Sequence, residues 1–66
     1  MTIQLNGNDR EFPEGTSLSS LLTALRLPPG PVAAQVNEEI VHRDRYDACV
    51  LHDGDVVEIF TMLGGG

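Results

Sequence analysis

The sequence predicts an α+β fold in which one amphipathic helix covers one face of a mixed β-sheet. Apolar residues alternate over residues 1–5 and again over 56–63, a pattern that is typical of half-buried strands. Between these segments, leucines recur at helical spacing within residues 18–25. The chain has 66 residues, of which 41% are hydrophobic and 21% charged, and this composition fits one small globular domain. A helix with a single apolar stripe must bury it against a sheet, so both elements belong to one core.

The chain begins with a predicted β-hairpin. In residues 1–5 the odd positions are apolar and the even positions polar. The dipeptide Asn6-Gly7 follows, and these residue types accept the positive φ angles of a tight hairpin turn. We expect the chain to return as a short strand over residues 10–12, with Phe12 in the core.

A single helix is predicted between the capping residues at 16–17 and the prolines at 28–29. Thr16 or Ser17 can cap its first turn by accepting a hydrogen bond from a free backbone N–H. Pro28 and Pro29 stop it, because proline lacks the N–H that a helix needs and restrains the residue before it. The apolar stripe consists of Leu18, Leu21, Leu22 and Leu25.

The second half of the chain is predicted to supply the remaining strands. Tyr46 is the expected apolar anchor of a polar helical turn. Gly54 lies between two aspartates, which is the composition of a tight turn. The expected elements are a strand over 32–37, a strand over 39–42, a helical turn over 43–48, a short extended piece over 49–51, a turn over 52–55 and a strand over 56–63.

The last strand carries an apolar residue on the face that is expected to meet solvent. Val57 and Ile59 alternate with Glu58, so Glu58 marks the wet side of the sheet. Phe60 and Met62 share that side and are therefore predicted to be exposed. An exposed aromatic beside a chain end indicates a docking patch. The alternatives are a register shifted by one residue and a loop that covers Phe60.

Charge and cysteine content limit the possible partners. Ten acidic residues oppose four basic ones, for a net charge of -6, so the electrostatic attraction that nucleic acids and anionic membranes require is missing. An acidic surface suits a protein partner with a basic face, and equally suits plain solubility. The single cysteine cannot form an internal disulfide, and no secretory signal or membrane-spanning stretch is evident, so we expect a cytoplasmic protein.

The side chains offer no persuasive catalytic or metal site. Cys49, His52, Asp53 and Asp55 lie close together in the sequence. Zinc sites usually combine two ligand pairs, and no second pair exists here. A nucleophilic cysteine needs a base nearby to lower its pKa, and none is evident. We therefore expect neither a metal nor enzymatic activity.

The chemically distinctive group is the α-carboxylate of Gly66. It is ionised at neutral pH, and it becomes an electrophile only after activation, for example as an acyl-adenylate formed with ATP in another protein's active site. Glycine suits a narrow channel because it has no side chain. We expect a globular domain over residues 1–63 and a flexible tail over 64–66. The tail is either a working part of this kind or a remnant of cloning.

Several features of the chain are distinctive when they are taken together. They are Asn37, Ile40, Val41 and Arg43 in "N-x-x-I-V-x-R", the turn Asp53 to Asp55, Phe60 in the last strand, and Gly65-Gly66. In these features the chain resembles the ThiS family, the sulfur carriers of thiamin biosynthesis. The similarity extends over essentially the whole chain, and it implies the ubiquitin-like β-grasp fold. Gly64 precedes the terminal pair of glycines that is typical of the family.

The resemblance also implies a reaction and its partners. An E1-like adenylating enzyme would activate Gly66 with ATP and Mg²⁺, although the chain itself binds no cofactor. A persulfide donor such as a cysteine desulfurase would supply sulfur, leaving a thiocarboxylate on Gly66. Thiazole synthase would then take that sulfur. The residues implied in partner binding are Phe60, Met62, Leu63, Gly64 and Gly65.

The sequence is also compatible with three other functions. The chain is also similar, less closely, to the sulfur carrier subunit of molybdopterin synthase. A protein modifier would end in an isopeptide bond to a lysine of its target. A plain binding module would make no use of the glycines. The chain contains no lysine, so we expect an activated terminus to acylate its own chain poorly.

Overall fold

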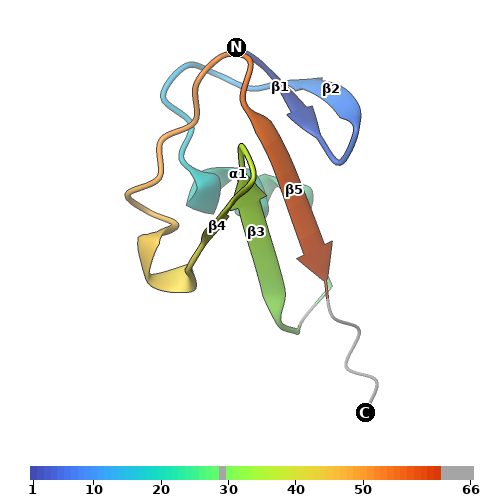
Figure 1. The fold of residues 1–66 in the computed structure, drawn as a ribbon, viewed down its shortest axis with the longest axis vertical. Helices are drawn as coiled ribbons and strands as arrows, with labels where there is room; N and C mark the ends of the chain where they lie inside the picture. Colours follow the sequence, from blue (N-terminus) through green and yellow to red (C-terminus); the bar gives the residue numbers. More distant parts are fainter. Residues whose placement is uncertain (29, 62–66) are drawn as a thin grey trace.

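The computed structural model, which describes residues 1–28 and 30–61, is a five-stranded mixed sheet crossed on one face by a single helix (Figure 1). The strand order is β2-β1-β5-β3-β4, in which only the β1–β5 pair is parallel. This confirms the predicted fold class. The elements are β1 (Thr2–Leu5), β2 (Asn8–Glu11), α1 (Leu18–Leu25), β3 (Val32–Val36), β4 (Glu39–Val41), the 3-10 helix η1 (Arg43–Arg45) and β5 (Val56–Thr61).

The first hairpin has the predicted turn but a different second strand. Asn6 and Gly7 adopt φ angles of 48° and 84°, as a two-residue hairpin turn requires. So short a turn lets Asn8 pair directly with Leu5. Strand β2 therefore begins at Asn8, and the expected strand over 10–12 was placed too late. Phe12 lies just beyond β2, half-buried against the core.

The helix begins after one of the two predicted caps and ends earlier than the predicted proline stop. The Ser17 hydroxyl accepts a hydrogen bond from the Ser20 N–H at 3.1 Å. At the other end Arg26 adopts a left-handed conformation, with φ of 51°, and its N–H donates to the carbonyl of Thr23. The helix thus ends before Pro28 is reached.

The core lies between α1 and the inner face of the sheet. Leu18 and Leu21 are completely buried, whereas Leu22 and Leu25 of the same stripe pack at its margin. The Tyr46 hydroxyl donates to the Val32 carbonyl at 3.3 Å and so fixes the segment after η1 to β3, as the anchor role predicts. The sheet contributes Ile3, Leu5, Ala34, Val57 and Ile59, and the segment before β5 contributes Leu51.

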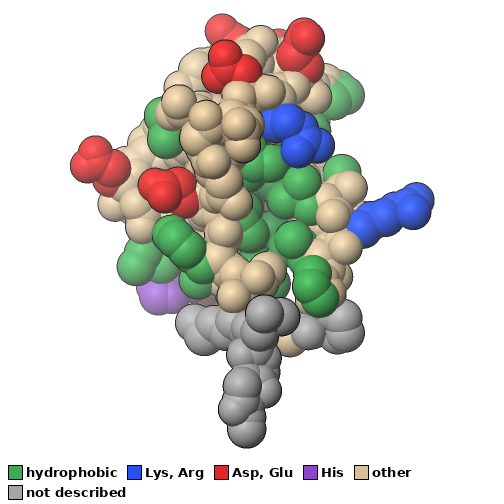
Figure 2. Space-filling model, turned by 90° about the vertical axis from the view of Figure 1, so that its right-hand side faces the viewer, with side chains coloured by type: hydrophobic (Ala, Val, Ile, Leu, Met, Phe, Trp, Pro, Cys, Tyr) green, Lys and Arg blue, Asp and Glu red, His purple; other side chains and the backbone are tan. Residues whose placement is uncertain are grey.

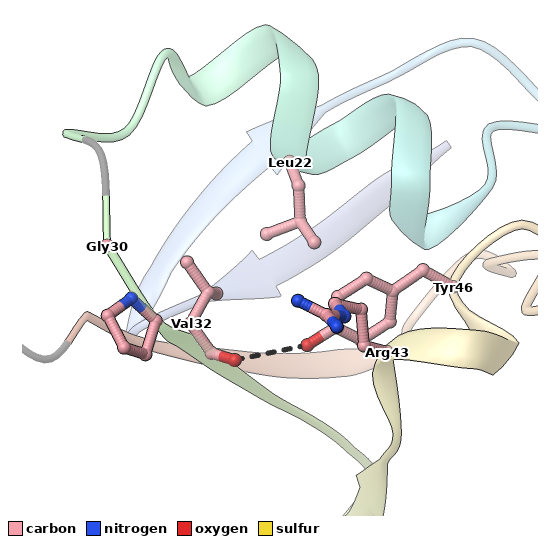
Figure 3. Close-up of a pocket in the computed structure, with 6 residues that line it drawn as sticks. Leu22, Gly30, Val32, Arg43 and Tyr46 are labelled. Carbon is pink, nitrogen blue, oxygen red and sulfur yellow. Dashed lines mark hydrogen bonds between the residues drawn. The ribbon is translucent and has the colours of Figure 1, made fainter.

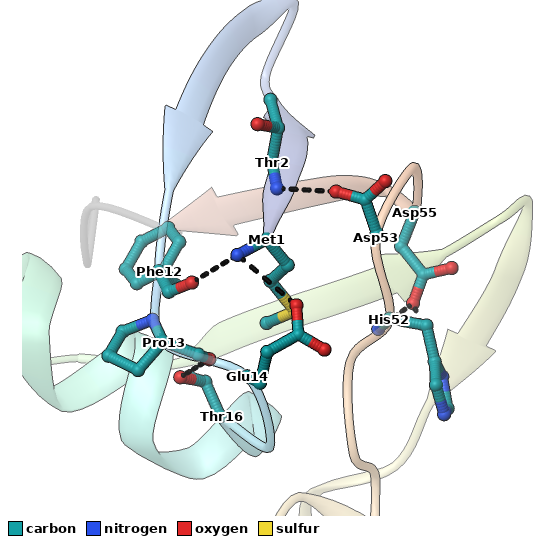
Figure 4. A network of polar contacts seen from close by, with 9 residues as sticks. All are labelled: Met1, Thr2, Phe12, Pro13, Glu14, Thr16, His52, Asp53 and Asp55. Carbon is teal, nitrogen blue, oxygen red and sulfur yellow. Dashed lines mark hydrogen bonds and ion pairs between the residues drawn. The ribbon is translucent and has the colours of Figure 1, made fainter.

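The segment that leads into β5 is held by its aspartates (Figure 4). The Asp53 carboxylate accepts a hydrogen bond from the Thr2 N–H at 2.7 Å, and the Asp55 carboxylate accepts one from the His52 N–H at 2.8 Å. Gly54, with φ of 87°, donates its N–H to the Thr2 carbonyl. The two aspartates are therefore turn residues, as predicted. Upstream, Val50 makes a single bridge with Ser17, and residues 49–51 form no strand.

Candidate functional site

Strand β5 leads directly to the predicted reactive end of the chain. It is the central strand, and it pairs with β3 up to the register Val32 opposite Thr61. Thr61 is the last residue that the structure describes. The predicted tail and the Gly66 carboxylate lie outside the described residues and stay predictions. The same holds for Met62, Leu63, Gly64 and Gly65.

The predicted exposure of Phe60 is confirmed. Val57 and Ile59 are buried under the helix, so the register of β5 is the one expected. Phe60 lies on the opposite face and is 49% exposed. Helix α1 lies behind the sheet in Figure 1, and the face that carries Phe60 is turned toward the viewer.

Other apolar side chains share this open face. Register places Ala33 of β3 directly opposite Phe60. Ile40 of β4 lies opposite Gln35, which shares the face of β3 that carries Ala33. Ile40 is 68% exposed. We call Ala33, Ile40, Val56 and Phe60 the open-face patch.

Acidic side chains accompany the open-face patch. Glu58 of β5 lies on the same face, and register places Asp9 and Glu11 of β2 there as well. Figure 2 views the molecule from the right of Figure 1, so the open face lies toward its left margin, where acidic side chains are visible, and further acidic side chains lie at the top. The surface beside β5 therefore combines apolar contact area with negative charge, which suits a partner face that is apolar at its centre and basic at its rim.

A pocket of about 430 Å³ lies beside the end of β5 (Figure 3). Leu22 reaches it from α1 and Val32 from β3, while Arg43 and Tyr46 come from η1 and the residue after it. Within residues 1–28 and 30–61, the Arg43 guanidinium takes part in no ion pair. The sequence placed Arg43 only in a family motif, and no local pattern reveals a pocket assembled from three elements. The full lining is Leu22, Gly30, Pro31, Val32, Arg43 and Tyr46.

The Cys49 side chain packs against the core and is partly buried. Burial raises its pKa above the ordinary value, and the negative charge of Asp55 raises it further. A thiol with a raised pKa is a poor nucleophile at neutral pH because little of it is thiolate. In the described part of the chain, no group of three His, Cys, Asp or Glu residues is placed to hold a metal ion. The His52 side chain is 79% exposed.

The element order, the mixed sheet and the single crossing helix define a ubiquitin-like β-grasp domain. The chain belongs to the ThiS family, whose model matches residues 3–66. A crystal structure of the thiamine biosynthesis protein ThiS from Geobacter metallireducens superimposes with a TM-score of 0.85. That protein is 32% identical, and the match covers all of both chains. The resemblance read from the motifs is thereby confirmed.

Two curated relatives differ in how much of them the chain covers. The Bacillus subtilis (strain 168) protein named sulfur carrier protein ThiS is 37% identical over 65 residues, which cover 97% of this chain and 98% of that protein. A Magnetococcus marinus protein named thiazole synthase is 39% identical over 66 residues. That match covers all of this chain but only 20% of the relative's length. None of the helices described has the length and apolar character needed to cross a membrane.

Proposed function

We propose that this chain is a sulfur carrier of thiamin biosynthesis that bears its sulfur on the carboxyl group of Gly66. The observation that carries this proposal is membership of the ThiS family, together with a relative of nearly equal length named as a sulfur carrier. The chain acts as a carrier and not as a catalyst, so bond-making groups are supplied by partner enzymes. The cytoplasm remains the predicted location.

The proposed reaction consists of adenylation, sulfur transfer and release of the thiocarboxylate. A carboxylate oxygen of Gly66 attacks the α-phosphorus of ATP in an E1-like adenylating enzyme, and pyrophosphate leaves with Mg²⁺. The terminal sulfur of a protein persulfide, such as that of a cysteine desulfurase, then attacks the acyl carbon and displaces AMP. A second thiol cleaves the resulting acyl disulfide, which releases the thiocarboxylate and leaves a disulfide on the donor side. The thiocarboxylate sulfur is ionised, soft and nucleophilic, as a sulfur donor must be.

Thiazole synthase is the proposed acceptor of the sulfur. In the Magnetococcus marinus protein named thiazole synthase, a segment equivalent to this whole chain makes up a fifth of the length. A carrier-like segment joined to the rest of a thiazole synthase supports a working relationship between the two, because fusion raises their effective concentration. The adenylating enzyme and the persulfide donor are proposed from the chemistry alone.

The open-face patch is the proposed docking surface for the adenylating enzyme. It carries Phe60, which is exposed only one residue before the end of β5. Aromatic residues are enriched at the centres of protein interfaces, and acidic neighbours favour a basic partner. A partner that docks here holds the strand from which the reactive end departs.

Intact mass spectrometry tests the proposal. The chain is incubated with ATP, Mg²⁺, a ThiS-type adenylating enzyme and a persulfide donor, and a variant lacking Gly66 serves as the control. We expect the mass to rise by the difference between sulfur and oxygen in the full chain only. Larger adducts on other proteins would identify a modifier, and an unchanged mass would refute the proposed function.

A further inference from the structure

Strand β5 is supported unequally on its two sides. On one side it pairs with β3 over five registers, from Val57 to Thr61. On the other side it pairs with β1 only where Gln4 and Leu5 lie opposite Val56 and Val57. Because β1 ends at Leu5, none of the strands in the described part of the chain pairs with Ile59 on that side.

The side chain of Asn6 takes the place of the missing strand. Its Oδ1 accepts a hydrogen bond from the Ile59 N–H at 2.8 Å, and its Nδ2 donates to the Ile59 carbonyl at 3.2 Å. The Asn6 backbone N–H donates to the Val57 carbonyl at 3.0 Å. The side-chain amide of asparagine carries an acceptor oxygen next to N–H donors, as a backbone peptide carries a C=O and an N–H, so it can continue the ladder for one further residue.

The hairpin turn makes this contact possible. Asn6 has a φ of 48° and is the first residue of the two-residue turn, directly after β1. Asparagine tolerates this left-handed conformation better than most residues. Glycine would satisfy the turn equally well but has no amide to offer. The turn residue therefore also serves a strand 53 positions away in the sequence.

We propose that Asn6 is a positioning residue for activation of the chain's carboxyl end. The two bonds to Ile59 fix the edge of β5 two residues before its last residue, Thr61. With this edge fixed, Thr61, the last residue that the structure describes, keeps one position and one strand direction relative to the sheet. This inference rests on the proposed function, because direction matters only if the end must enter a partner's active site. Geometry of this kind affects the reaction rate of the bound complex more than its affinity.

Asn37, in the turn between β3 and β4, provides a matched control because its side chain also binds β5. It also adopts a positive φ, of 50°, in a hairpin turn. Its Oδ1 accepts a hydrogen bond from the Val56 N–H at 2.9 Å, and its Nδ2 donates to Asp55 at 3.0 Å. Asn37 thus binds the first residue of β5, at the end away from the carboxyl terminus. A substitution there removes the same number of side-chain hydrogen bonds, one of them again from a backbone N–H of β5.

The test compares N6G and N37G, since glycine keeps both turns unstrained. Hydrogen exchange by NMR measures protection of the Ile59 amide relative to the buried Leu21 amide. Steady-state kinetics with the adenylating enzyme, followed as carrier-dependent exchange of pyrophosphate into ATP, gives kcat and KM. We expect N6G to lose about tenfold of the Ile59 protection, as for one ordinary hydrogen bond, and to lower kcat severalfold with KM nearly unchanged. N37G should leave both quantities near the values of the unmodified chain.

The variant N6D tests the acceptor and the donor of the Asn6 amide separately. N6D keeps the acceptor for the Ile59 N–H but places a carboxylate oxygen opposite the Ile59 carbonyl, so partial recovery of protection and kcat is expected. Equal kcat for N6G, N37G and the unmodified chain would overturn the proposal, as would an Ile59 amide that N6G leaves fully protected. If the unmodified chain supports no exchange at all, the proposed function itself fails, even where the Ile59 protection behaves as expected.

Discussion

Truncation of Phe60 to alanine should weaken recognition by the adenylating enzyme without harming the fold. Phe60 is 49% exposed, so about half of its surface remains available to a partner. Full burial of a phenylalanine side chain contributes about 1.5–3 kcal/mol, and the exposed half therefore about 1 kcal/mol. A difference of that size corresponds to about a fivefold change in an equilibrium constant.

The assay is the KM for the carrier in pyrophosphate exchange, supported by direct binding to the enzyme in the absence of ATP. Val50 supplies the control, because it is 47% exposed and lies outside the sheet, beside Ser17. Phe60→Ala should raise KM about fivefold and leave kcat nearly unchanged. Val50→Ala should change neither.

Two results would refute this reasoning. An unchanged KM for Phe60→Ala would show that the open-face patch does not meet the enzyme. Equal increases for Phe60→Ala and Val50→Ala would show that the effect arises from general loss of apolar surface or of stability. Thermal unfolding of both variants separates the second explanation from a specific contact.

Three further predictions concern the scaffold and its thiol. Leu21→Ala empties a fully buried position and should cost about 2–5 kcal/mol of unfolding free energy in urea titrations; a smaller loss would mean that the core closes over the gap. Ser17→Ala removes the acceptor for the Ser20 N–H and should cost about 1 kcal/mol by the same measurement, whereas Ser17→Asp should restore most of it. Because burial and Asp55 raise the pKa of Cys49, the thiol contribution to stability is complete below its ordinary pKa of 9.0 and is lost as the pH rises through the folded value. Alkylation of Cys49 should accordingly be slow at neutral pH and accelerate on alkaline titration or on unfolding, and fast alkylation of the folded chain at neutral pH would contradict the assignment.

The elements of the fold could be predicted from the sequence because each has a local signature. Strand alternation, the leucine stripe and the Asn6-Gly7 turn each need only a few neighbouring residues. The position of Phe60 followed from the same alternation, with Glu58 marking the solvent face. The start of β2 was missed because the length of a hairpin turn, and not apolar content, decides where pairing resumes.

The supports of the site could not be predicted in this way because they join residues far apart in the chain. Asn6 reads locally as a turn residue, and nothing near it indicates a contact with Ile59. The pocket beside the end of β5 likewise needs Leu22, Val32 and Arg43 from three separate elements. Alternation also does not state which strands are neighbours, so the strand order and the central place of β5 were not predicted.

The central place of β5 has a geometric consequence for the proposed reaction. Gly66 lies six positions after Phe60, and a fully extended chain spans at most about 3.3–3.6 Å per residue. The reactive carboxylate can therefore reach no farther than about 22 Å from the backbone of Phe60. A partner that grips Phe60 must hold its ATP α-phosphate within that radius. If β5 were an edge strand, fraying would let the position of Phe60 vary. Instead, β5 is held by β3 on one side and by β1 and Asn6 on the other. The sheet would thus contribute to a reaction in which none of the chain's side chains takes part, because it fixes the position of the end of β5.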